Sequence, residues 1–263
     1  MTPSTAETEI RGIDVAGPED GRPIVFVHGA MFTRKMWAPQ RDALDDEFRV
    51  IAPDLPGHGE RAGESFDLEP AIDLLDEVVD SAAGGRAVLV GLSLGGYVIA
   101  EYANRFPEKV DGLVVVGSSA NPVRGMNLLT RITGGLARLA TRSDLVERGV
   151  RRAGERWVRN RDLSGETEAE IIESGIYPRE FGTPGPDLAG RNFRAALASF
   201  AGPALIVNGE RDLMMRGGED EHASVGGADV EIIEGVGHIC NLHRPERFTE
   251  VVREFVRGLD DDG

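Results

Sequence analysis

The chain alternates short apolar runs with stretches of helical periodicity, and this alternation restricts its fold more than any other feature. The runs are rich in β-branched residues and end near glycine or proline, as buried strands do. Strands that alternate with helices form a mostly parallel sheet with helices on both faces, which is an α/β fold. The expected strands are residues 24–27, 50–52, 87–90, 113–116, 204–207 and 230–233. The expected helices are residues 37–44, 68–81, 94–105 and 246–257.

The alternation stops between about residues 122 and 201, where arginine-rich amphipathic stretches precede a segment rich in proline and glycine. Apolar residues in this segment recur at intervals of three or four, which is typical of helices with a buried face. They are Leu128, Ile132, Leu136 and Leu139. A chain of 263 residues suits one α/β domain with an insertion. We therefore expect a core of residues 1–121 and 202–263 with an inserted helical cap of residues 122–201. A loose linker is the alternative.

One junction between an expected strand and helix has the sequence GLSLG at residues 91–95 and places Ser93 in a tight turn. The pattern G-x-S-x-G needs small residues beside the serine, because the serine is held in a strained backbone conformation with its hydroxyl exposed. The next helix begins at Leu94, so its dipole favours an oxyanion beside the turn. The junction predicts a nucleophilic serine, with an ordinary glycine-rich turn as the alternative.

A serine hydroxyl is a weak nucleophile without a base, so an acid and a histidine are required further along the chain, in that order. Asp212 and His238 each follow an expected strand directly. Both lie at the carboxyl edge of the expected sheet, where open α/β folds place their sites. Glu210 and Asp220 compete with Asp212 for the role of acid, and a loop histidine without a role is the alternative for His238.

The formal net charge of −16, with a pI of about 4.8, argues against nucleic acid and anionic membranes as partners. Only Lys35 and Lys109 are lysines. GC-rich codon usage and adaptation to high internal salt both explain this composition. The N-terminal residues lack a signal-peptide pattern, no apolar stretch is long enough to cross a bilayer, and the single cysteine, Cys240, has no internal disulfide partner. We therefore expect a cytoplasmic protein that is a monomer or homodimer.

Five segments of the chain resemble the successive signature stretches of the α/β-hydrolase superfamily, over about residues 22–257. They are VHGAMFTRKMW, APDLPGHGE, VGLSLGGYVIAEYA, VNGERD and GVGHICNLHRPERF. Within the superfamily they are similar to the esterase, enol-lactonase and haloperoxidase-like branch. The last motif of that branch commonly reads GHxxNxExPxxF, and here His243 stands where the branch often has glutamate. This departure leaves Ser93, Asp212 and His238 in place, but it weakens assignment to one lactonase subfamily.

The resemblance implies roles for the loops after the first two expected strands. The backbone N–H groups of Ala30 and Leu94 would form the oxyanion hole, and Met31 and Phe32 would border the substrate pocket. The further residues His28 and Asp54 would brace their loops, whereas a metal site formed by His28 and His58 is the competing interpretation. The candidate lining residues in the cap are Trp157, Tyr177 and Phe181, together with Leu128 and Ile132, and packing inside the cap is the alternative for them.

Together these features predict a serine hydrolase that cleaves a small carboxylic ester or lactone through an acyl-enzyme, without a metal or organic cofactor. Ser93 would attack the carbonyl, His238 would act as base and then acid, and Asp212 would orient the imidazole. Acyl transfer, C–C bond hydrolysis and perhydrolysis use the same residues and remain open. A small-molecule receptor with the same fold is the rival from another class. Dehalogenase and epoxide-hydrolase chemistry is disfavoured, because the members of the superfamily that carry out these reactions have aspartate at the position of Ser93. Cys240 lacks such a turn and is interpreted as a small packing residue.

Overall fold

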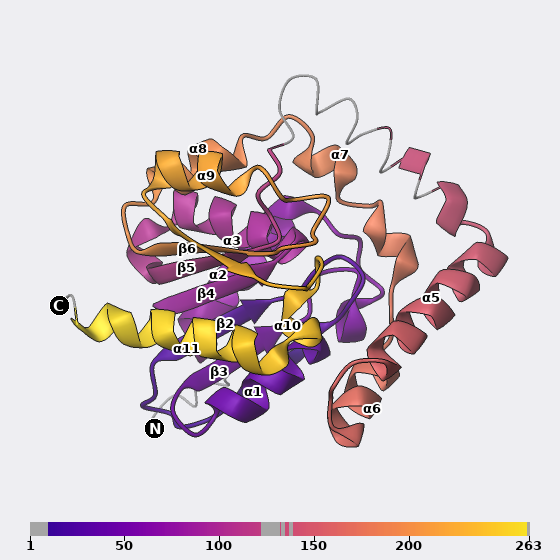
Figure 1. Ribbon diagram of the computed structural model, residues 1–263, viewed down its shortest axis with the longest axis horizontal. Helices are drawn as coiled ribbons and strands as arrows, with labels where there is room; N and C mark the ends of the chain where they lie inside the picture. Colours follow the sequence, from indigo (N-terminus) through magenta and orange to yellow (C-terminus); the bar gives the residue numbers. More distant parts are fainter. Residues whose placement is uncertain (1–9, 122–131, 133–134, 137–138, 262–263) are drawn as a thin grey trace, which may run out of the picture.

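The computed structural model describes residues 10–121, 132, 135–136 and 139–261. At its centre lies a seven-stranded sheet with the strand order β1-β3-β2-β4-β5-β6-β7 (Figure 1). Strand β1 pairs antiparallel with β3, and every other pair of neighbours is parallel. The mostly parallel sheet expected from the sequence is therefore confirmed. The strands are β1 (Ile13–Ala16), β2 (Pro23–Val27), β3 (Arg49–Pro53), β4 (Ala87–Leu92), β5 (Val110–Val116), β6 (Ala204–Gly209) and β7 (Asp229–Ile233).

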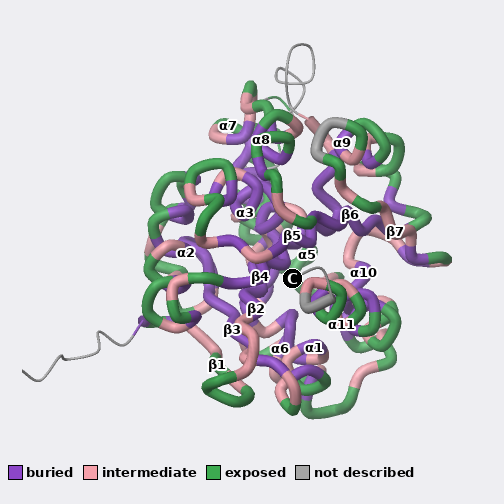
Figure 2. The backbone as a smooth tube through the Cα atoms, turned by 90° about the vertical axis from the view of Figure 1, so that its left-hand side faces the viewer, coloured by how far each residue is buried: buried purple, intermediate pink, exposed green. Residues whose placement is uncertain are grey.

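Alternate residues of the central strands enter two hydrophobic clusters, one on each face of the sheet. In β2, Val25 and Val27 belong to one cluster, and Ile24 and Phe26 belong to the other. The first cluster is covered by α2 (Leu68–Ala82), α3 (Leu94–Arg105) and α8 (Phe193–Ser199), with α9 (Glu219–Gly226) beside it. The second is covered by α1 (Ala38–Leu44), α10 (Cys240–His243) and α11 (Pro245–Asp261). The sheet is consequently buried on both sides (Figure 2).

The described part of the core contains three elements that the sequence patterns did not indicate, namely β1, α9 and the four-residue helix α10. Strand β1 is a four-residue edge strand, too short to show an alternating pattern, and its pairing with β3 defines it. Helix α9 is a short, acidic helix that packs against α8 and β6. Four short 3₁₀ helices connect the larger elements in the described part of the chain: η1 (Arg34–Trp37), η2 (Gly59–Arg61), η3 (Pro107–Lys109) and η4 (Pro178–Phe181).

The segment between β5 and β6 is largely helical where it is described. It contains α5 (Asp144–Arg159), α6 (Gly165–Glu173), η4, α7 (Gly185–Leu188) and α8. Helix α8 packs against α3, so this last part of the insertion is built into the core (Figure 1). Ile132, Leu136 and Leu139 are 50%, 61% and 62% exposed, so the buried face expected from their spacing is not present at these three positions. Leu128 lies outside the described residues.

Charged and polar contacts fasten α6 to the core. Glu170 pairs with Lys35 at 2.7 Å and with Arg41 at 2.8 Å, and the Arg41 hydrogen bond, with a smaller opposing effect of burial, lowers the pKa of Glu170 to about 2. The hydroxyls of Ser174 and Thr33 lie 2.7 Å apart. No helix in the described part of the chain combines the length and apolar character needed to span a membrane.

Candidate active site

Ser93 lies at the carboxyl end of β4, in a turn that leads directly into α3. Its backbone angles are φ 56° and ψ −112°, and it is the only non-glycine residue with positive φ in the described part of the chain. Such a conformation costs about 1–3 kcal/mol and persists only where the surrounding structure enforces it. The turn thus has the strained geometry that the sequence pattern predicted.

The two glycines of this turn are required by close backbone contacts. A β-carbon at Gly95 would lie 2.1 Å from the carbonyl oxygen of Val27, and one at Gly91 would lie 2.5 Å from the carbonyl carbon of Gly95. Neither distance is sterically allowed. The start of α3 is therefore packed directly onto the end of β2, which fixes the direction of the Ser93 side chain.

His238 and Asp212, which are 26 residues apart in the sequence, are joined by a hydrogen bond of 2.7 Å between Nδ1 and Oδ2. Asp212 is 2% exposed, and its other carboxylate oxygen accepts a hydrogen bond from the N–H of Met214. Burial alone would raise the pKa of Asp212, but the hydrogen bond from His238 and the backbone N–H groups of Met214 and Met215 lower it overall. The carboxylate is therefore ionised and holds the Nδ1–H of the imidazole.

The structure separates Asp212 from the two competing acids. Glu210 is exposed and accepts a hydrogen bond of 2.8 Å from the N–H of Gly235. Asp220 lies exposed in the first turn of α9. Of the three acids considered, Asp212 alone makes a hydrogen bond to His238.

Ser93 and His238 both lie beside the carboxyl end of β5. The N–H of Ser93 donates to the carbonyl of Val116 at 2.8 Å, and the Ser118 hydroxyl donates to the Ser93 carbonyl at 2.8 Å. A β-carbon at Gly117 would lie 3.1 Å from Nδ1 of His238. Both residues are described, and no hydrogen bond joins their side chains; such bonds are often long in enzymes without substrate and shorten on binding.

The loop after β2 lies against the Ser93 turn. A β-carbon at Gly29 would lie 3.5 Å from Cβ of Ser93, and the N–H groups of Ala30 and Leu94 make no hydrogen bond within the described residues. They are the two donors expected to bind an oxyanion. Leu94 is the first residue of α3, so its N–H has no partner within the helix.

Two buried histidines and one aspartate hold this loop. His28 Nε2 accepts from the N–H of Leu55 at 2.9 Å, and His58 Nε2 lies 2.9 Å from the carbonyl oxygen of Ala30. Burial, with the neighbouring His58, lowers the pKa of His28 well below its usual range. Asp54 accepts from the N–H groups of Arg34 and Glu60, each at 2.9 Å.

The ring nitrogens of His28 and His58 are directed at backbone groups rather than at a common point. Within the residues that the structure describes, no cluster of three or more histidine, cysteine or acidic side chains is arranged to hold a metal. The geometry of the two histidines is that of loop braces, the role implied for His28 by the resemblance.

A buried polar network behind Asp212 was not found from the sequence. Glu219 is 4% exposed and accepts from the N–H of Gly217 at 2.7 Å and from the Asn208 amide at 3.3 Å. The same amide donates to the hydroxyl of Ser119, which donates to the carbonyl of Met215. These contacts fix the loop that carries Asp212. The buried Asn208 at the end of β6 was the available signal, because a buried amide requires partners.

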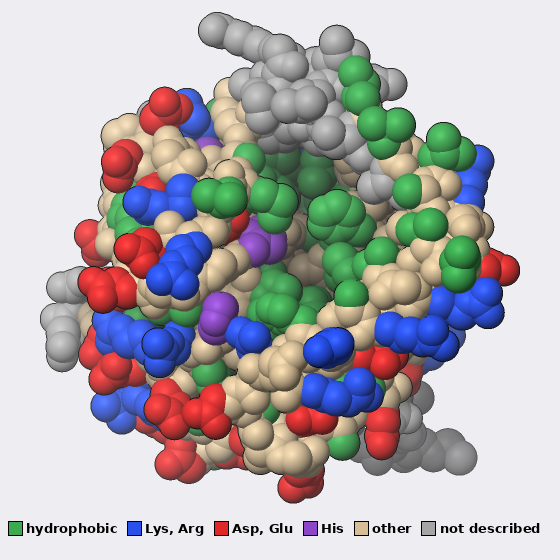
Figure 3. Space-filling model, turned by 45° about the vertical axis from the view of Figure 1, so that its right-hand side comes forward, with side chains coloured by type: hydrophobic (Ala, Val, Ile, Leu, Met, Phe, Trp, Pro, Cys, Tyr) green, Lys and Arg blue, Asp and Glu red, His purple; other side chains and the backbone are tan. Residues whose placement is uncertain are grey.

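The residues expected to line a pocket occupy different environments. Phe32 is 5% exposed and belongs to the hydrophobic core, whereas Met31 and Trp157 are partly buried and pack against it. The ring centroid of Tyr177 lies 5.6 Å from that of His58, and the backbone N–H of Tyr177 donates to the carbonyl of Met31. Phe181 is 52% exposed. The surface is hollowed where hydrophobic and histidine side chains meet (Figure 3).

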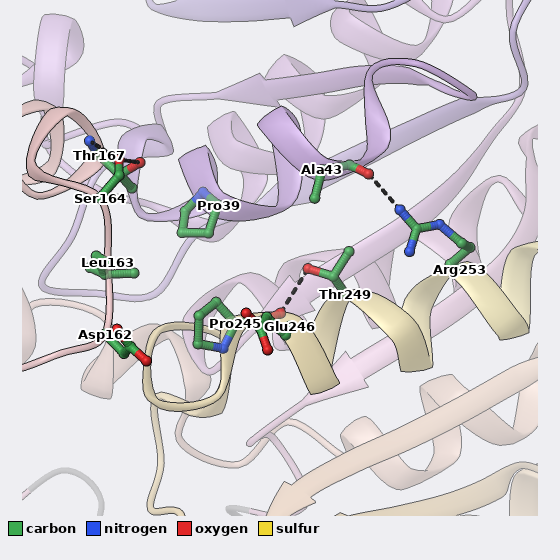
Figure 4. Close-up of a pocket in the computed structure, with 10 residues that line it drawn as sticks. All are labelled: Pro39, Ala43, Asp162, Leu163, Ser164, Thr167, Pro245, Glu246, Thr249 and Arg253. Carbon is green, nitrogen blue, oxygen red and sulfur yellow. Dashed lines mark hydrogen bonds between the residues drawn. The ribbon is translucent and has the colours of Figure 1, made fainter.

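A separate cavity of about 330 Å³ lies between α1, the start of α6 and α11 (Figure 4). Pro39, Leu163 and Pro245 are among its lining residues, and Ser93, Asp212 and His238 are not. This cavity is therefore distinct from the site around Ser93.

The neighbours of His238 on α10 include a buried thiol and a second imidazole. Cys240 is fully buried, and burial raises the pKa of its thiol to about 12, which is the environment of a packing residue. The ring of His243 lies edge-on to that of Trp157, with 6.3 Å between the ring centroids. The guanidinium of Arg161 lies over the Trp157 ring, 4.5 Å from its centroid. Trp157 thereby connects α5 to the helix beside His238.

Comparison with known proteins agrees with this geometry. Residues 24–251 match the model of the alpha/beta hydrolase family. Carboxylesterase YbfK of Bacillus subtilis (strain 168) is 26% identical over 94% of this chain and 84% of its own length. A pimeloyl-[acyl-carrier protein] methyl ester esterase of Neisseria meningitidis is 28% identical over 92% of this chain and 96% of its own length.

Among solved structures, a thermophilic esterase from Thermogutta terrifontis superimposes with a TM-score of 0.75 at 25% identity, covering 94% of this chain and 93% of its own. The family match spans the Ser93 turn, Asp212 and His238 together, and the sheet is mostly parallel, as expected from the sequence. On these grounds the chain belongs to the alpha/beta hydrolase family.

Proposed function

We propose that this protein is a serine hydrolase that cleaves a small carboxylic ester or lactone, with Ser93 as nucleophile, His238 as general base and acid, and Asp212 as the orienting acid. The observation that carries the proposal is the 2.7 Å hydrogen bond between His238 Nδ1 and buried Asp212 beside the strained Ser93 turn. Because the ionised carboxylate holds the proton on Nδ1, the lone pair of Nε2 is free to accept a proton from Ser93.

The first half of the reaction forms an acyl-enzyme. The Ser93 oxygen attacks the substrate carbonyl as its proton passes to Nε2 of His238, and the N–H groups of Ala30 and Leu94 bind the oxyanion. The tetrahedral intermediate then breaks its bond to the leaving oxygen, which takes the proton from Nε2. An ester releases an alcohol at this stage, whereas a lactone leaves its own hydroxyl attached to the acyl group.

The second half of the reaction restores Ser93. Nε2 takes a proton from water, the hydroxide oxygen attacks the acyl carbonyl, and collapse of the intermediate returns the proton to Ser93 with release of a carboxylic acid. The ionised Asp212 stabilises the imidazolium in both halves. His238 takes part in every proton transfer, and the inserted helices beside Trp157 supply the candidate cap over the substrate.

The experiment that tests this proposal measures hydrolysis of p-nitrophenyl esters of increasing acyl length and of a small lactone, at low salt and in molar KCl. Ser93→Ala is measured beside the native protein, and the exposed Ser81→Ala serves as the matched control. We expect Ser93→Ala to lose about 10³-fold or more in kcat and Ser81→Ala to lose none. Near-native turnover by a folded Ser93→Ala protein would falsify the proposal, and a native protein that binds these compounds without turnover would favour the receptor.

A further inference from the structure

The outward face of α5 carries a row of arginines. Arg148, Arg152, Arg156 and Arg159 follow one another at intervals of four, four and three residues, which places them on one face of the helix about 4.5–6 Å apart along its axis. All four are exposed. Between Arg142 and Arg161 the chain has seven arginines and three acidic residues, whereas its overall net charge is −16.

Three of these arginines are without carboxylate partners. Arg148 bonds the carbonyl of Asp144, and Arg152 and Arg156 pair with no acidic side chain in the described part of the chain. Elsewhere most arginines pair with carboxylates, as Arg86 does with Asp111. In a chain with such an excess of acid, an unpaired row of cations is a surface suited to an anionic partner.

Large apolar side chains lie exposed on the same helix. Leu145 is 75% exposed, and by helical periodicity it shares the arginine face. Val146 and Val150 are 41% and 36% exposed, and because they stand two residues before Arg148 and Arg152 they lie on the opposite side of the helix. Of the residues in α5, only Val158 is buried. On this side of the molecule, basic side chains lie along the right-hand edge, and hydrophobic side chains lie between them and the hollow (Figure 3).

We propose that α5 docks this protein on the surface of an anionic lipid bilayer, with the arginines at the phosphate groups and Leu145 inserted among the acyl chains. An interfacial helix has this composition: an arginine-rich polar face, exposed apolar residues and low overall hydrophobicity. A polyanion without apolar groups would attract the arginines but would leave the exposed Leu145 in water, whereas a bilayer offers both phosphate groups and an apolar phase. The negative net charge of the whole chain is an average over its surface, and the net charge of α5 is positive. The repulsion from anionic surfaces that the average implies therefore does not apply to this helix.

The docking brings the hollow close to membrane-dissolved molecules. A consequence for the substrate, that amphiphilic esters reach Ser93 from the bilayer, rests on the proposed function, but the docking itself does not. Binding to lipid is measured without turnover, so its failure and the failure of the hydrolase proposal are distinguishable.

The test is co-sedimentation of the full chain with phosphatidylcholine vesicles that contain or lack phosphatidylglycerol, in low salt and in molar KCl. We expect binding only with phosphatidylglycerol, and stronger binding in low salt because salt screens the arginines. Arg152→Glu/Arg156→Glu should weaken partitioning by about tenfold or more, and Leu145→Ser should weaken it in both salt conditions.

The matched control is Arg86→Glu/Arg257→Glu, which makes the same change in charge at two exposed arginines outside α5. It should sediment with the anionic vesicles like the native chain. The proposal is overturned by a native chain that stays in solution with anionic vesicles, or by a folded Arg152→Glu/Arg156→Glu protein that binds them as the native chain does. Binding to polyglutamate but not to vesicles assigns α5 to an acidic protein and overturns it as well.

Discussion

The loops at the carboxyl edge of the sheet and the helix α5 of the insertion are held by the structure in opposite ways. The loops that carry Ser93, Asp212 and His238 are fixed by backbone hydrogen bonds, buried polar side chains and glycines without room for a β-carbon. Helix α5 has one buried residue and several exposed apolar ones. The comparison shows that the groups proposed for the chemistry are held by many buried contacts, whereas α5, which is proposed for substrate and surface contacts, is held by few.

The largest effect is expected at the acid of the rigid region. Asp212→Asn replaces the carboxylate with an amide whose NH2 group can donate to Nδ1 and so favour the wrong tautomer of the imidazole, and we expect kcat/KM for an ester cleaved by the native protein to fall by about 10³- to 10⁴-fold. Glu210→Gln is the matched control and should retain about native activity, because Glu210 is exposed and bonds Gly235 instead. Equal losses in the two variants would contradict the assignment of the acid.

A second test adds one methyl group to each region and compares the results. Gly95→Ala places a β-carbon 2.1 Å from the Val27 carbonyl oxygen, and we expect the free energy of unfolding to fall by about 3 kcal/mol or more, or the protein not to fold. Gly149→Ala lies inside α5, where the new carbon would have no atom within 4 Å apart from its chain neighbours and the backbone of its own helix, and it should stabilise the helix by up to about 1 kcal/mol. Denaturant unfolding measures both. Similar changes in the free energy of unfolding for Gly95→Ala and Gly149→Ala would contradict the difference in packing between the Ser93 turn and α5.

A third test concerns α6, the part of the insertion that is fastened to the core. Glu170→Gln weakens the contacts to Lys35 and Arg41, and we expect a loss of about 1 kcal/mol, since the ion pairs are partly solvated. The folded pKa of Glu170 is lowered to about 2 from an ordinary value of 4.5. Its contribution is therefore complete above about pH 4.5 and is lost as the pH falls towards 2.

Thermal unfolding of the native protein and of Glu170→Gln between pH 7 and pH 3 measures this contribution. The difference in stability should stay constant down to about pH 4.5 and shrink as the pH falls from there to 3. A difference that grows in acid would show that Glu170 does not act as a carboxylate anchor for α6.

The smallest effect is expected where α5 approaches the site. Trp157 packs against His243 and Arg161, and Trp157→Ala should change KM for long-chain esters by about threefold to tenfold while kcat for the acetate ester stays near the native value. A large fall in kcat on all esters would place Trp157 in the positioning of the chemistry and would weaken the distinction between the two regions.

The sequence was informative wherever a local rule of backbone geometry applied. The expected strands and helices of the core are present, and the turn at Ser93 has the strain that GLSLG predicted. The insertion was less predictable, because its apolar spacing indicates helices but does not say which face is covered. Ile132, Leu136 and Leu139 illustrate this, since helical spacing led to an expected buried face and all three are exposed.

The amino-acid sequence by itself determined the α/β alternation and the Ser93 turn, because short-range sterics and strand burial require particular residue types at particular positions. Only the tertiary structure decided that Asp212, and neither Glu210 nor Asp220, meets His238, and that Glu219 is buried behind the loop of Asp212. These choices depend on which strand ends lie side by side in the sheet, and pairing between residues far apart in the chain leaves no local pattern in the sequence.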